Sequence, residues 1–141
     1  MQASIFDFDA YLRQLLEPRR GTLGQVARHK LLYAVHRLAI CKTDKPAFQA
    51  RCEAWKLGPV FVELWNSPNQ IGNPDVLTTR HKRFCELVAR ILGTQSGRSL
   101  AARSHAKYPE WHEARRASRW KKFNAEITVD AIRKQLALVA P

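Results

Sequence analysis

Histidine and cysteine are the residues of this sequence whose chemistry could support catalysis or metal binding. His29 and His36 are seven residues apart, and so are His105 and His112. Seven residues span two helical turns, so each pair shares a helix face but lies too far apart to hold one ion without a third element. No cysteine and histidine cluster has the spacing of a zinc site. We therefore expect no metal site, and we interpret these histidines as surface or capping residues.

The three cysteines are Cys41, Cys52 and Cys85, and they form no CxxC pair. An odd count without a paired motif suits free thiols in a reducing compartment. A Cys–His nucleophile pair stays open as an alternative, because such partners meet in space and not in sequence. There is also no glycine-rich loop of the kind that cradles phosphate.

Basic residues are in excess and unevenly distributed. The 141 residues hold 24 Lys and Arg against 12 Asp and Glu, a formal net charge of +12, and the segment 80–122 contributes +9 of it. Its run WHEARRASRWKK interleaves Trp111 and Trp120 with a basic cluster: Arg115, Arg116, Arg119, Lys121 and Lys122. Phosphate neutralisation with aromatic stacking would use this composition, and so would an acidic protein partner. The alternative is a solvated basic face with inward-turned tryptophans. We expect the basic cluster to be exposed.

Length and composition indicate one globular domain over residues 1–141. Apolar residues make up 45% and charged residues 26% of the chain, which argues against disorder. The N-terminal segment MQASIFDFDA has no basic residue, unlike a secretory signal or a transit peptide. No stretch approaches the roughly 18–20 apolar residues of a membrane span. We expect a cytoplasmic protein without a membrane partner.

Helical periodicity dominates the sequence and must position these residues. It predicts a first helix that Asp7 caps and Pro18 stops. Thr22 and Gln25 predict a capping box for a second helix that runs to about Cys41. Apolar residues wrap more than one side of this second helix, so we expect it to be the central and most buried one.

The remainder of the chain also favours helices. Residues 47–56 are ambiguous between a strand and irregular structure, whereas Gly58 and Pro59 predict the start of a short helix, because proline pre-sets helical φ. Further helices are expected at about 78–92, 99–105, 110–120 and from Thr128 onward. The predicted fold class is mainly α: a single compact multi-helix domain with a buried central helix and at most one short strand or hairpin.

Three blocks of the sequence carry a family resemblance: RHKLLYAVHRLAI, EAWKLGPVFVELW and SLAARSHAKYPEWHEAR. In this order they resemble the Panacea domain family, the SocA/GepA-like group of antitoxin and phage-associated proteins. The resemblance covers about residues 8–138, and Glu53 to Val60 is its most specific part. There are three departures: Leu57 stands in place of an aromatic residue, Glu110 is inserted before Trp111, and Ser104 replaces a threonine.

The resemblance implies an antitoxin that binds and neutralises a cognate toxin encoded beside it, with no catalytic activity and no cofactor. One studied type of relative is a proteolytic adaptor that delivers its toxin to an ATP-dependent protease. The positions that match family motifs are the candidate partner-binding residues: Lys30, Tyr33, Trp55, Lys56, Gly58, Pro59, His105, Trp111 and Arg115. The alternative function, based on charge, is a basic nucleic-acid-binding regulatory protein.

The same motif positions also have a purely structural interpretation. Large aromatic residues such as Trp55 and Trp111 are commonly core residues, and His105 could be a buried histidine bonded to a backbone carbonyl. Lys30, Lys56 and Arg115 are instead expected to be exposed, because unpaired Lys and Arg are rarely fully buried.

Overall fold

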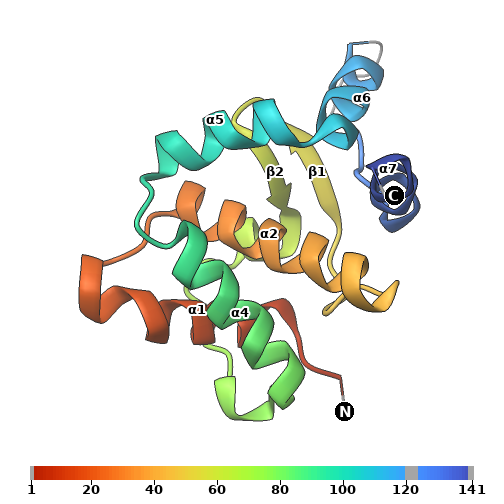
Figure 1. The fold of residues 1–141 in the computed structure, drawn as a ribbon. Coiled ribbons are helices and arrows are strands. Elements are labelled where there is room, and N and C mark those ends of the chain that lie inside the picture. Colours follow the sequence, from red (N-terminus) through yellow and green to blue (C-terminus); the bar gives the residue numbers. More distant parts are fainter. Residues whose placement is uncertain (1, 120–123, 140–141) are drawn as a thin grey trace.

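One long helix crosses the middle of the molecule, and the other elements pack around it (Figure 1). The computed structural model describes residues 2–119 and 124–139. Its elements are α1 (Ile5–Arg20), α2 (Gln25–Thr43), β1 (Cys52–Trp55), β2 (Gly58–Phe61), α3 (Val62–Asn66), the 3-10 turn η1 (Pro74–Val76), α4 (Thr79–Leu92), α5 (Gly97–Lys107), α6 (Pro109–Ser118) and α7 (Val129–Val139). The predicted fold class, mainly α with at most one short strand or hairpin, is confirmed.

Helix α2 is the central and most buried helix, as its apolar pattern predicts. It contacts α1, α4, α5, α7 and β2, and Figure 1 shows α5 on one side of it and α1 and α4 on the other. Leu31, Leu32, Tyr33 and Val35 have no exposed surface. Within the described residues no helix, α2 included, is long and apolar enough to cross a membrane.

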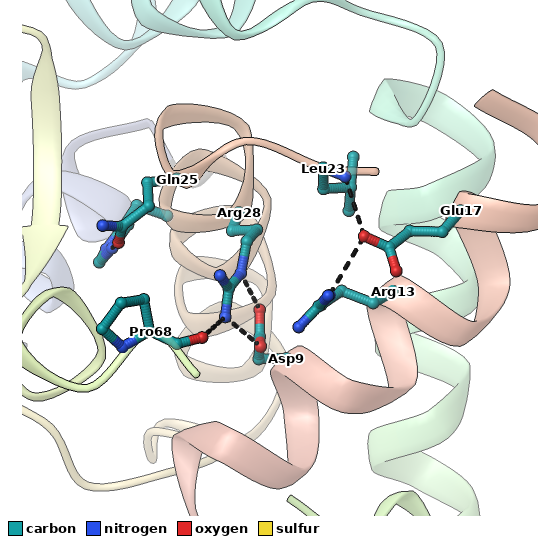
Figure 2. A network of polar contacts seen from close by, with 8 residues as sticks. Asp9, Arg13, Glu17, Leu23, Gln25, Arg28 and Pro68 are labelled. Carbon is teal, nitrogen blue, oxygen red and sulfur yellow. Dashed lines mark hydrogen bonds and ion pairs between the residues drawn. The ribbon is translucent and has the colours of Figure 1, made fainter. Parts of the chain in front are cut away.

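Several polar side chains of α2 are buried as well and are bonded to a surrounding element. Arg28 lies between α1 and the loop after α3, as Figure 2 shows. Its Nη2 donates to Asp9 Oδ2 at 2.7 Å and to the Pro68 carbonyl at 2.8 Å, and its Nε donates to Asp9 Oδ1 at 3.0 Å. Breaking such a buried pair by removing one partner costs about 3–5 kcal/mol, because the remaining charge is uncompensated. Arg28 therefore fixes two elements against α2.

The short hairpin packs on α2 through two more of these side chains. Strands β1 and β2 are antiparallel, with Cys52 opposite Phe61 and Trp55 opposite Gly58. His29 Nδ1 accepts the Phe61 N–H at 3.0 Å, so this imidazole is neutral, and burial lowers its pKa to about 3. The other edge of β1 is covered by residues 124–127, through bonds such as that from the Ala54 N–H to the Ala125 carbonyl.

The short helix predicted to begin at Gly58 and Pro59 is wrong, because these residues form β2 and the helix begins at Val62. Gly58 has a φ of +117°, which lies outside the helical range. The carbonyl of Pro59 accepts a bond from Lys30 Nζ at 2.9 Å, so α2 binds the backbone in an extended conformation.

The predicted boundaries of the first two helices also change. Ser4, not Asp7, is the N-cap of α1, and Asp7 accepts the Ser4 N–H from three residues inside the helix. Pro18 lies within α1, where a proline removes only one backbone donor, in the exposed last turn. The predicted capping box of Thr22 is absent, since the N-cap of α2 is Gly24.

Replacing Leu31 with Ala tests the central position of α2. The side chain is fully buried, so the free energy of unfolding should fall by roughly 2–5 kcal/mol. Leu138, which is 71% exposed on α7, provides the matched control. Leu138→Ala should change the free energy of unfolding by less than about 0.5 kcal/mol. Urea denaturation measures both variants, and equal stability of the two would contradict the central position.

The buried His36 side chain makes the free energy of unfolding depend on pH. Its ring lies among those of Tyr33, Phe48 and Phe61, and its Nδ1 has no hydrogen-bond partner within the described residues. Burial lowers its pKa from the ordinary 6.5 to about 4. The unfolded chain therefore takes up a proton first as the pH falls, and stability declines between about pH 6.5 and 4.

Removing this imidazole should flatten that acid dependence. Between pH 7 and 5 the contribution of His36 to the loss is about 2 kcal/mol, and His36→Phe should remove it. The measurement is urea denaturation at both pH values, with Leu138→Ala as a control that carries no titratable change. An unchanged loss in His36→Phe would rule out a neutral buried imidazole.

Candidate partner-binding surface

The second and third motif blocks meet at the tip of the hairpin. Three consecutive carbonyls of β1 and its turn are bonded to side chains of α5 and α6. Trp111 Nε1 donates to the Trp55 carbonyl at 2.9 Å, and Arg115 Nη1 donates to that of Ala54 at 3.1 Å. His105 Nε2 lies 3.1 Å from the Lys56 carbonyl. These bonds fix the hairpin tip against the two helices.

The first block is joined to the hairpin from beneath. Lys30 is 4% exposed, contrary to the expectation of exposure, because its ammonium bonds to the Pro59 carbonyl inside the protein. Burial lowers the pKa of Lys30 to about 8. A Cβ on Gly58 would lie 2.6 Å from Lys30 Cε and 3.0 Å from Ser104 Oγ. Glycine is thus required by this close approach as well as by its positive φ.

Tyr33 of the first block is buried and binds α6. Its hydroxyl donates to Glu110 Oε2 at 2.5 Å, and Arg37 Nε donates to the same oxygen at 2.8 Å. Burial, together with the Glu110 carboxylate, raises the pKa of Tyr33. Sequence reasoning treated Glu110 as a mere insertion and missed this contact, since no local pattern pairs it with residues more than 70 positions away.

The exposed part of the tip forms a surface that we call the hairpin-tip surface: Trp55, Lys56, Leu57, Trp65 and His105. Lys56 and His105 are exposed, Leu57 is 53% and Trp65 37% exposed, and Trp55 is half-buried. The rings of Trp55 and Trp65 pack edge to face at 5.1 Å. Leu57 and Trp65 were absent from the predicted set. The sequence marks Leu57 only as a departure from the family pattern, and it marks Trp65 only by its aromatic type.

A wide groove of about 780 Å³ adjoins this surface along α6, and we call it the α6 groove. Its lining includes His105, Trp111, His112, Arg115, Arg116 and Arg119. The ring of Trp111 stacks on that of His105 at 4.3 Å and meets that of His112 edge to face at 4.8 Å. Trp111 itself is buried, as its structural interpretation predicts, whereas His105 is exposed although it does contact a backbone carbonyl.

The predicted basic cluster is exposed only in part. Arg116 and Arg119 are exposed in the groove, as expected. Arg115 is half-buried instead, because its Nη1 also donates to Asn124 Oδ1 at 2.8 Å and so joins α6 to the following segment. Lys121 and Lys122 lie outside the described residues.

Comparison with known families decides what kind of domain carries these features. The family model of the antitoxin SocA-like Panacea domain matches residues 29–112, which run from the first turns of α2 into α6. The chain belongs to the Panacea domain family. No match was found among curated proteins or among solved structures. In this Panacea domain the matched segment contains Lys30, Tyr33 and the whole hairpin-tip surface.

The interpretation of the histidines as surface or capping residues is wrong for His29 and His36, because both side chains are buried. Cys41 is exposed, whereas Cys52 and Cys85 are buried, and all three are free. Burial raises the pKa of both buried thiols, that of Cys85 to about 12, which disfavours the nucleophilic thiolate. Within residues 2–119 and 124–139, no three His, Cys, Asp or Glu side chains gather to hold a metal ion.

Proposed function

We propose that this Panacea-domain protein is an antitoxin that neutralises a cognate toxin, encoded nearby, by direct protein–protein contact. Family membership supports the antitoxin role. The observation that carries the binding mode is the division of the motif positions. Lys30, Tyr33 and Gly58 are buried and hold the hairpin, while Lys56 and His105 are exposed on one face. This face is the proposed toxin-binding surface.

The composition of that face suits a protein interface. Binding energy at interfaces concentrates in a few aromatic and apolar anchors surrounded by a polar rim. Leu57 and Trp65 provide exposed anchors, and Trp65 is supported from behind by the rings of His29 and Trp55. The exposed guanidiniums of the α6 groove would form the rim, where charge mainly affects the association rate.

We further propose that the protein acts without catalysis and without a cofactor. This is supported by the buried thiols with raised pKa values and by the lowered pKa of the buried His29 and His36. Delivery of the bound toxin to an ATP-dependent protease would add a second protein partner. Toxin that disappears faster in cells that hold both the antitoxin and an active protease would support this adaptor role.

A nucleic-acid-binding regulator is the second candidate function. It is favoured by one feature, the α6 groove, in which Arg116 and Arg119 lie beside the stacked rings of His105 and Trp111. Phosphates and bases would be bound by such a combination. Binding of a mixed-sequence duplex should then weaken steeply with salt.

Two kinds of variant test the antitoxin proposal against the toxin encoded by the neighbouring reading frame. Leu57→Ser removes an anchor and should speed dissociation, with a loss of about tenfold or more in affinity. The double change Arg116→Ser with Arg119→Ser removes rim charge, so it should slow association and flatten its salt dependence. Surface-based binding kinetics at two salt concentrations provide the measurement.

Matched controls separate these effects from changes in folding or net charge. Ile71→Ser removes an equally apolar residue that is 92% exposed on a loop outside the proposed face. Arg83→Ser with Arg98→Ser removes the same charge from exposed positions of α4 and α5. Normal toxin binding by Leu57→Ser, or tight salt-sensitive duplex binding without toxin binding, would contradict the proposal.

A further inference from the structure

A second, smaller groove lies away from the hairpin, between α2, α4, α5 and α7. Its volume is about 240 Å³, which is room for one side chain. Apolar residues form most of its wall: Ala34, Leu38, Leu87, Val88, Ile91, Leu92 and Leu136. Ile91 is 59% exposed at its wall, so part of this apolar surface is open to solvent.

The remaining lining is basic and lacks a matching acid. Arg37 and Arg103 both line the groove beside Tyr108. The guanidinium of Arg37 lies 5.0 Å from the centre of the Tyr108 ring and is paired with the buried Glu110. Arg103 has no ion pair, and its buried Nε has no hydrogen-bond partner, among the residues that the structure describes.

The Arg103 side chain lines the groove and is partly exposed, so a ligand in the groove can contact its guanidinium. Guanidinium groups bind carboxylates with geometric specificity, through two parallel hydrogen bonds. Because Glu110 already accepts bonds from Tyr33 and Arg37, it is not the acceptor that Arg103 lacks. The groove therefore suits a ligand that places a carboxylate against Arg103 and an apolar group against the apolar wall.

We propose that this groove binds a segment of a protein partner that inserts one apolar side chain and pairs an adjacent carboxylate with Arg103. The partner would be the toxin, so the inference rests on the proposed function for the partner's identity. The groove would then be a second contact with the toxin, and its lining shares no residue with the hairpin-tip surface. Aliphatic residues next to Asp or Glu are the sequence pattern that it fits.

Capped dipeptides test the groove without the toxin. The probes are acetyl-Leu-Asp-amide, its uncharged isostere acetyl-Leu-Asn-amide, and acetyl-Gly-Asp-amide, which lacks the apolar side chain. Titration followed by NMR should shift the amides of groove residues, with Leu-Asp binding roughly three- to tenfold more tightly than either of the others. Because Cys41 lines the groove and is the exposed thiol, bound Leu-Asp should also slow its alkylation by iodoacetamide.

Two arginine variants on the same helix identify the carboxylate partner. Arg103→Gln should abolish the preference for Leu-Asp over Leu-Asn, whereas Arg98→Gln, exposed and outside the groove, should keep it. Equal binding of Leu-Asp and Leu-Asn to the unmodified protein would overturn the proposal even if Arg103→Gln failed to fold. Shifts that cluster elsewhere, or an unprotected Cys41, would overturn it too. Failure of the toxin experiment would leave these outcomes unaffected, so the two proposals can fail separately.

Discussion

The burial of most of α2 among its neighbours is the constraint on which the rest of the structure depends. A helix enclosed in this way offers little water to its polar side chains, and each unsatisfied buried group costs about 1–3 kcal/mol. Several polar side chains of α2 avoid this cost by bonding to neighbouring elements. Arg28 bonds to α1, His29 and Lys30 bond to β2, and Tyr33 and Arg37 bond to α6. The polar residues of α2 therefore determine where its neighbours lie, and apolar packing fills the space between them.

This constraint explains why the family motifs contain so many buried residues. Lys30 and Gly58 touch each other under the hairpin, and Tyr33 holds the start of α6 through Glu110. Their combined effect is to fix one turn, with Lys56 and Leu57 at its tip, against two helices. The exposed residues of that turn are then free to differ without loss of the frame, and this is the property that a partner-binding surface requires.

Much of the helical framework could be predicted from the sequence, because apolar periodicity reports directly on burial. It indicated α2 as the central helix and two separate helices where α5 and α6 lie, while residues 47–56 stayed ambiguous between a strand and irregular structure. The strand at Gly58 could not be predicted, since its conformation depends on bonds from α2, about 30 residues away. The burial of Lys30 was missed for the same reason: its acceptor is a backbone carbonyl that no side-chain pattern reveals. Likewise, Arg115 turns inward because of carbonyl and amide partners on other segments.

Native-state hydrogen exchange tests the dependence on α2 most directly. The account predicts that the amides of Leu31, Leu32 and Val35 exchange only through global unfolding. The Phe61 amide, which donates to His29, should exchange with the same free energy. That shared value should equal the free energy of unfolding from urea denaturation and exceed the values of α4 and α7. Exchange of the α2 amides through a smaller opening, while α4 or the hairpin stays protected, would contradict the account.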